Sequence, residues 1–180
     1  MISIMQSIKK KYVDLIVSGK KKVEIRKTGP RYNEGEDTIY KVFIYETKAN
    51  GGCGKVIGHY YSRVKRFDSA FSEWAWSVAP AGATMPMSED EAWRLATKEG
   101  CVTEDELRAY LKSYEGDYKL VFFHIFDLEV YDKPKSLNRF TRSSIDPSKP
   151  SASAVCPMYG RKPLTRAPQS WCYVEEKDGR

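Results

Sequence analysis

Residues 7–27 read SIKKKYVDLIVSGKKKVEIRK, and this stretch carries two hydrophobic periods in succession. Its first half places apolar side chains at the i, i+4, i+7 and i+8 positions of one helix face, namely Ile8, Tyr12, Leu15 and Ile16. Its second half alternates as a strand does, with Val23 and Ile25 separated by charged residues. We therefore predict a helix with Ser7 as its N-cap and Gly19 just beyond its C-terminus, followed directly by a strand.

The chain has 180 residues, the length of one domain, and its formal net charge of +6 is unevenly distributed. Residues 1–27 hold eight basic and two acidic residues, residues 133–170 hold eight basic and one acidic residue, and the remainder has a net charge of −7. Two basic blocks that flank an acidic middle indicate an anionic partner, although solvated lysines that merely cluster give the same pattern. With such a partner, both blocks should lie on one face, around Lys21, Glu24 and Arg26.

Composition disfavours three classes of protein. No apolar run approaches the about 18 residues that a membrane-spanning helix needs. The N-terminus, MISIM, lacks the charged n-region and the long apolar h-region of a signal peptide. The four cysteines lie far apart without a Cys-x-x-Cys motif, and there are only two histidines, so neither a zinc site nor a disulfide framework is expected. We predict a cytoplasmic protein that needs no metal and no cofactor.

The rest of the chain consists of strands, a helical segment and a proline-rich extension. Three further runs are predicted strands: residues 38–46, 55–64 and 118–131. Residues from about 67 to 115 contain two capping-box patterns and are predicted to be helical. The pattern predicts an α+β domain over residues 1–132 with this helical insert inside it. Residues 133–180 form a Pro/Ser-rich basic extension, whose strand-like end at 169–174 we expect to pack back on the domain.

A resemblance to a known family rests on four residues at the spacing G-x-K-x-x-E-x-R, namely Gly19, Lys21, Glu24 and Arg26. This spacing resembles the hallmark of the ASCH domain family in the PUA-like superfamily. The strand at 42–45, the glycine loop and the V-I-G strand at 56–58 also resemble this family, and the ending PQSWCYV at 168–174 resembles bacterial and phage-type members. The resemblance covers residues 2–66 and 117–131. It implies a small β-barrel of five to six mostly antiparallel strands with a packed N-terminal helix, and a cleft between barrel and helix that the hallmark lines.

The resemblance and the charge pattern together favour a protein that binds RNA or a modified nucleotide in this cleft. Lysine and arginine bind phosphate, a carboxylate accepts hydrogen bonds from a base, and tyrosine rings stack on bases. The candidate binding residues are Lys9, Lys11, Tyr12, Lys21, Glu24, Arg26, Tyr45, Ser170 and Trp171. Further phosphate contacts are expected from Arg139, Arg142, Arg161, Lys162 and Arg166. The plainer alternative is a structural ion pair between Glu24 and Arg26, with the aromatic residues in the core.

An enzymatic alternative follows from the same resemblance. Some small ASCH proteins hydrolyse N4-acetylcytidine with a threonine nucleophile, a lysine and a glutamate, and others are ribonucleases. The lysine corresponds to Lys21, but Glu24 stands in the place of the threonine, so the nucleophile is absent. In this alternative Glu24 acts as a general base on water and Lys21 stabilises the oxyanion. A protein-interaction role for the acidic helical insert is a third possibility, supported by little beyond its charge.

Overall fold

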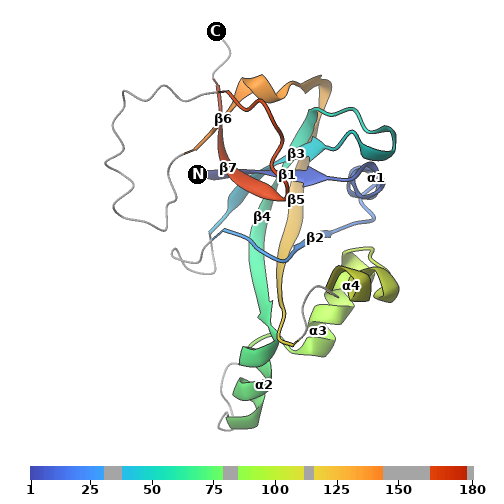
Figure 1. Ribbon diagram of the computed structural model, residues 1–180, viewed down its shortest axis with the longest axis vertical. Helices are drawn as coiled ribbons and strands as arrows, with labels where there is room; N and C mark the ends of the chain where they lie inside the picture. The colour runs from blue at the N-terminus through green and yellow to red at the C-terminus, as the bar shows by residue number, and fades with distance from the viewer. Residues whose placement is uncertain (31–37, 79–84, 112–115, 144–162, 178–180) are drawn as a thin grey trace, which may run out of the picture.

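The computed structural model describes residues 1–30, 38–78, 85–111, 116–143 and 163–177, and its centre is one seven-stranded sheet (Figure 1). The strands lie in the order β2-β5-β4-β3-β1-β7-β6. Their bounds are β1 Ile2–Ile8, β2 Val23–Arg26, β3 Tyr40–Glu46, β4 Val56–Asp68, β5 Lys119–Lys135, β6 Phe140–Arg142 and β7 Trp171–Glu176. Among the pairs of these described strands, β1 and β3 run parallel and the others run antiparallel.

The fold is α+β as predicted, but the predicted barrel is not confirmed. β2 and β6 are the two ends of the strand order, and no ladder between described residues joins them, so the sheet is open. β2 has only four residues, and a side chain bridges its outer edge, because Arg26 Nη2 donates to the backbone oxygen of Ser7 in β1 at 2.8 Å. A closed barrel would need a backbone ladder between β2 and β6, whereas this bond joins β2 to β1, which already pairs with β3 and β7.

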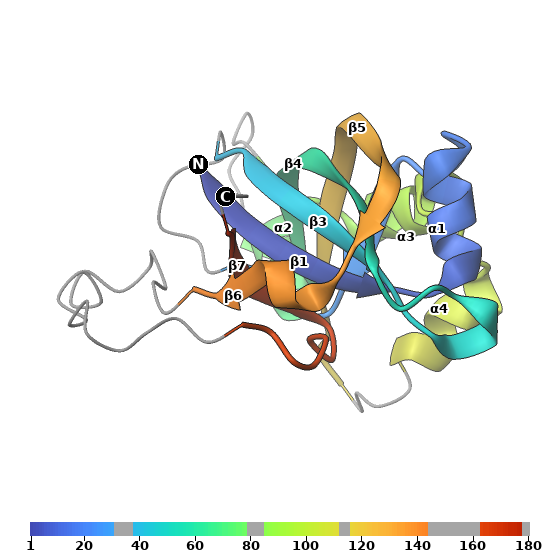
Figure 2. The same ribbon diagram turned by 90° about the horizontal axis from the view of Figure 1, so that it is seen from above.

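Within the described residues, four α-helices and three short helical turns accompany the sheet. They are α1 Lys10–Val17, α2 Ser69–Val78, α3 Glu89–Arg94 and α4 Glu104–Leu111, with the turns η1 Ala49–Gly51, η2 Leu95–Glu99 and η3 Leu137–Arg139. α1 and α4 lie close together in both views (Figures 1 and 2), whereas α2 extends from the far end of β4 and β5 (Figure 1). The three helices after β4 all fall within residues 67–115.

The start of α1 differs from the prediction. Ser7 is not the N-cap because it belongs to β1, where its N–H donates to Ser170 O at 3.0 Å and its Oγ donates to Pro168 O at 2.5 Å. Lys9 takes the N-cap position, with extended backbone and no side-chain cap. Gly19 follows the helix with φ +70°, which confirms the predicted end. A segment 161 residues away in the chain therefore decides where the first helix begins.

The alternation of side chains along β2 assigns its residues to two faces of the sheet. Val23 and Ile25 face the outer side, where they join an apolar cluster with α3, η2 and α4. Glu24 and Arg26 point to the opposite, inner side, whose apolar cluster includes α1. That inner cluster contains Ile4, Ile8, Val13, Ile16, Tyr40, Val42, Ile44, Ile57, Tyr60, Val121 and Phe123. The two charged residues of β2 are thus directed at the interior beside α1.

β5 is the longest strand, and it bends, as its length predicts. Its pairing with β4 keeps register up to Tyr61 opposite Phe126, and β5 then accommodates one extra residue before His59 pairs with Glu129. Asp127 lies in this bulge with φ +49°, a conformation that aspartate adopts more readily than most residues. The bulge shifts which β5 side chains face outward on either side of it.

The C-terminal extension is built into the sheet. β7 pairs antiparallel with β1, and β6 pairs antiparallel with β7. β5 itself runs through residue 135, so one continuous strand crosses the boundary predicted at residue 132. Within the described residues, no helix combines the length and the apolar character needed to cross a membrane.

Two histidines should make the stability of this fold depend on pH. His59 is 5% exposed, and burial, followed by the charge of Lys41, lowers its pKa below the ordinary 6.5. Burial, followed by the charge of Lys65, likewise lowers the pKa of His124. The unfolded chain then binds more protons than the folded chain, so the free energy of unfolding falls as pH drops through 6.5.

We expect a lower urea midpoint at pH 5.5 than at pH 7.5, and a smaller difference between the two pH values in the double variant H59Q/H124Q. An unchanged difference in that variant would assign the effect to other groups.

Candidate functional site

A groove of about 650 Å³ opens between α1, β2 and α4. Its floor is made by Lys21, Glu24 and Arg26. Most of the remaining lining comes from the two helices and the residues that precede them, and Thr47, Ala49 and Gln169 add to it. The two helix walls include Lys9, Lys11 and Tyr12 on the α1 side and Val102, Glu106, Leu107 and Tyr110 on the α4 side. The first six of the predicted binding residues therefore line one groove.

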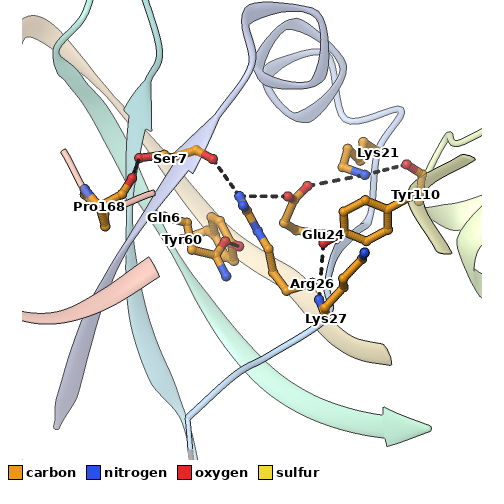
Figure 3. A network of polar contacts seen from close by, with 10 residues as sticks. Gln6, Ser7, Lys21, Glu24, Arg26, Lys27, Tyr60, Tyr110 and Pro168 are labelled. Atoms are coloured by element: carbon orange, nitrogen blue, oxygen red, sulfur yellow. Dashed lines mark hydrogen bonds and ion pairs between the residues drawn. The ribbon is translucent and has the colours of Figure 1, made fainter. Parts of the chain in front are cut away.

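The floor of the groove is a buried ion network (Figure 3). Glu24 lies between two cations, with Oε1 3.0 Å from Arg26 Nη2 and Oε2 3.3 Å from Lys21 Nζ. The exposed fractions of the side chains are 2% for Lys21, 7% for Glu24 and 11% for Arg26. Backbone oxygens hold both ends, because Lys21 Nζ donates to Gly100 O and Arg26 Nη2 donates to Ser7 O. The network thereby ties β2 to the segment before α4 and to β1.

This network has a structural role and also leaves polar groups unsatisfied beside the groove. Removing ions from water costs several kcal/mol per ion, which only close partners offset. Arg26 Nε and Thr47 Oγ1 are buried and have no hydrogen-bond partner among the described residues, and both residues line the groove. A buried polar group without a partner costs roughly 1–3 kcal/mol. The ion pair expected under the plainer alternative is present, but as part of a larger network.

Tyr12 and the exposed lysines Lys9 and Lys11 form the rim on the α1 side. The ammonium groups of Lys11 and Lys21 lie 4.5 and 5.0 Å from the centre of the Tyr12 ring, in cation–π geometry. Lys11 also pairs with Glu106 of α4, and this hydrogen bond is the main cause that lowers the pKa of the Glu106 carboxyl below the ordinary 4.5. Lys9 is exposed. The rim thus presents a half-buried aromatic ring beside two lysines that solvent can reach.

The wall opposite α1 consists of residues that the sequence does not mark as a site. Tyr110 Oη accepts from the backbone N–H of Lys27 at 3.2 Å, and Lys27 Nζ lies 4.7 Å from the Tyr110 ring centre (Figure 3). The predicted capping box at the start of α4 is present, because Thr103 and Glu106 exchange side-chain to backbone hydrogen bonds of 3.1 Å. That pattern indicates where α4 begins, but only the packing of α4 against β2 turns this helix toward the groove.

Three predicted binding residues lie outside the groove lining. Tyr45 is 7% exposed in an apolar cluster between β1, β3, β4 and β7, and this burial is incompatible with stacking on a base. Ser170 accepts a backbone hydrogen bond from Ser7. Trp171 begins β7, and its Nε1 donates to Thr28 Oγ1 at 3.1 Å. These residues help to attach the C-terminal strand to the sheet.

The second basic block also contributes little to the groove. Of the described residues in 133–170, Gln169 alone lines it, and Lys135 is paired with Glu176 at 2.5 Å. The described arginines of the block lie outside the lining: Arg139, Arg142 and Arg166. Arg161 and Lys162 lie outside the described residues. The expected placement of both blocks around Lys21, Glu24 and Arg26 is therefore not confirmed.

The chemistry that the groove offers is charge, hydrogen bonding and stacking. Among the residues with described positions, no three His, Cys, Asp or Glu side chains cluster as metal ligands. Lys21 has three N–H donors, of which two are directed at Gly100 O and Glu24, and each Glu24 oxygen keeps a lone pair beyond its ion pair. Cationic donors, a carboxylate acceptor and an aromatic face therefore converge on one space.

Replacement of Glu24 by glutamine should strongly destabilise the fold, because it leaves Lys21 and Arg26 buried without an anion. Removing one partner of a buried ion pair costs about 3–5 kcal/mol, which a urea titration measures directly. D14N is the matched control, since it removes the carboxylate of the exposed pair between Lys10 and Asp14 and should cost no more than about 0.5 kcal/mol. Equal losses in the two variants would contradict a supporting role for the network.

Comparison with known proteins identifies the family. The model of the ASCH domain family matches residues 7–122, which include α1, the floor of the groove and α4. The crystal structure of ASCH from Zymomonas mobilis is similar to this structure, with a TM-score of 0.54 and 21% sequence identity. The match covers 96% of this chain and 87% of that chain. The crystal structures of two single-substitution variants of that protein, one tyrosine-to-phenylalanine and one serine-to-alanine, are also 21% identical to this chain, and each match covers 96% of it. The match covers 90% of the tyrosine-to-phenylalanine variant with a TM-score of 0.50, and 88% of the serine-to-alanine variant with a TM-score of 0.53. A search of curated proteins gives no significant match. The solved structures show a shared fold, and the family match shows that the chain belongs to the ASCH domain family.

Proposed function

We propose that the groove binds a segment of single-stranded RNA or a modified nucleotide. The ASCH family is generally thought to bind RNA. The observation that carries the proposal for this chain is the rim, where Tyr12 lies half-buried beside the cations of Lys9 and Lys11 above a charged floor. The volume of about 650 Å³ falls within the roughly 300–1,000 Å³ of small-molecule sites.

Each part of the groove has a distinct role in this proposal. Lys9 and Lys11 neutralise phosphates at the opening, where both side chains reach solvent. The Tyr12 ring stacks on a base, a contact worth about 1–3 kcal/mol. Glu24 accepts from an exocyclic amine or a ring N–H of that base. Arg26 Nε, which has no partner among the described residues, donates to a ligand oxygen after a small rearrangement of the floor.

Hydrolysis by Lys21 and Glu24 is the second candidate, and the position of both residues in the groove favours it. Both side chains are less than one-tenth exposed and already engaged with Arg26 and Gly100 O. A general base has to reach a water and its proton directly, whereas a binding residue needs only a spare lone pair. The geometry supports binding better than turnover.

Removal of the rim lysines should weaken binding of a labelled six-nucleotide RNA, measured by fluorescence anisotropy at several salt concentrations. K9A/K11A should bind roughly tenfold more weakly at low salt, and its slope of log affinity against log salt should fall by about 0.7 for each lost phosphate contact. Y12L should lose roughly tenfold in affinity through lost stacking. The matched control K133A/K177A removes two exposed lysines outside the groove and should bind within twofold of the wild type.

Two results would contradict this proposal. One is no affinity for the RNA at low salt, and the other is an equal loss in the control K133A/K177A. The same mixtures, and parallel mixtures with N4-acetylcytidine, are analysed by chromatography for cleavage or deacylation. Turnover by the wild type would favour the enzymatic candidate over simple binding.

Substitution of Glu106 should strengthen RNA binding, whereas substitution of the rim lysines weakens it. Its carboxylate occupies Lys11 and lowers the positive charge at the rim. E106Q frees that lysine for phosphate and should tighten binding of the same RNA about two- to fivefold, the range expected for an exposed ion pair. E104Q removes a carboxylate from the same helix outside the groove lining and serves as the control. Weaker binding by E106Q would indicate that Glu106 contacts the ligand itself.

A further inference from the structure

A second surface with binding chemistry lies on the outer face of the sheet, away from the floor of the groove. Tyr61 of β4 pairs with Lys41 of β3 on one side and with Phe126 of β5 on the other. Residues directly opposite each other on paired strands share a face, and so do alternate residues of one strand. These two rules also place the buried residues His59, Phe67 and Phe122 on this face. The members that are not buried form the outer strip: Lys41, Tyr61, Arg63, Lys65, His124 and Phe126.

Two aromatic rings form a platform at the centre of the outer strip. The rings of Tyr61 and Phe126 lie side by side, with centroids 6.3 Å apart and planes inclined by 28°. Both side chains are half-buried, so each keeps one part accessible. The bulge at Asp127 ends the regular alternation directly beyond Phe126. The platform therefore ends at a defined place along β5.

Three basic residues lie around this platform, and the carboxylate of Glu129 lies beyond it, 3.8 Å from His59 Nε2. Arg63 and Lys65 are exposed, and Lys41 is half-buried with its Nζ 5.1 Å from the ring centre of Phe43. These positive charges lower the pKa values of two neighbouring histidines. Burial is the largest cause for both, followed by the charge of Lys65 for His124 and by the charge of Lys41 for His59. The outer strip itself holds no carboxylate. Three carboxylates oppose the lysines with a smaller effect on these pKa values: Glu99 acts on His124, and Glu129 and Glu176 act on His59.

The outer strip is separate from the groove. Glu24 and Arg26 point to the inner face of β2, whereas Val23 and Ile25 of the same strand face outward. Val23 lies opposite His124, a member of the outer strip. The groove also reaches the α4 side of β2, where Ile25 and Leu107 line it, but no residue of the outer strip lines the groove.

We propose that the outer strip is a second contact site for single-stranded RNA, with bases stacked on Tyr61 and Phe126 and phosphates held by Lys41, Arg63 and Lys65. This inference rests on the proposed function, since it extends RNA binding from the groove to another face. A flat sheet face with partly exposed aromatic rings suits unstacked bases, which a duplex does not offer. One RNA that reaches both surfaces gains affinity because the second contact becomes intramolecular.

The experiment compares a six-nucleotide and a twenty-nucleotide single-stranded RNA, each measured by fluorescence anisotropy at low salt. The wild type should bind the longer RNA at least tenfold more tightly. R63A/K65A and Y61L/F126L should each lose about tenfold in affinity for the longer RNA and stay within twofold for the shorter RNA. The matched controls are K133A/K177A for charge and F71L/W74L for exposed aromatic residues, since Phe71 and Trp74 lie on α2 outside both surfaces. Thermal melting of every variant confirms that the fold is retained.

The outcomes separate the outer strip from the groove. Unchanged affinity of R63A/K65A and Y61L/F126L for the longer RNA, with K9A/K11A still weakened for both lengths, would overturn the outer strip alone. Loss of longer-RNA affinity in the strip variants, with K9A/K11A unaffected at both lengths, would overturn the groove and keep the outer strip. Equal losses in the matched controls, or equal competition by duplex RNA of the same length, would overturn the proposed single-strand contact.

Discussion

Glu24 holds two cations in the interior, and the position of β2 depends on this arrangement. β2 has four residues and pairs only with β5 among the described strands, so its backbone ladder fixes it weakly. Lys21 and Arg26 add anchors at Gly100 O and in β1, which keep α1 and α4 on two sides of one groove. A substitution at Glu24 therefore alters fold and site together, and lost binding in such a variant does not identify a ligand contact. The exposed rim lysines carry that information instead.

Local signals in the sequence predict local structure well in this chain. Gly19 adopts the left-handed conformation expected just after the helix, and the capping box of α4 forms as predicted. The errors concern features that depend on distant residues. Ser7 fails as an N-cap because Pro168 and Ser170 engage it in the sheet, and the barrel fails because closure depends on how the two edge strands meet. Neither property is encoded within one stretch of ten or twenty residues.

The candidate site also has one part that the local sequence predicts and one part that depends on distant residues. The floor and the α1 rim fall within residues 7–27, so one motif locates them together. The α4 wall comes about 80 residues later in the chain, and nothing in its own pattern distinguishes a groove-facing helix from a solvated one. Tyr45 shows the corresponding limit for strands. Alternation predicts that successive residues face opposite sides, but it does not say which side is filled by other parts of the chain, and here β7 fills it.

β1 is the first strand of the chain, yet it lies inside the sheet between β3 and β7. When the polypeptide leaves the ribosome, β3 follows soon after β1, whereas β7 emerges only after residue 171. One edge of β1 therefore stays without its final partner until β7 has been synthesised. An uncovered strand edge is a template for pairing with other chains, and nascent chains with such edges are prone to aggregate. Pairing with β7 is thus the step that covers this edge of β1.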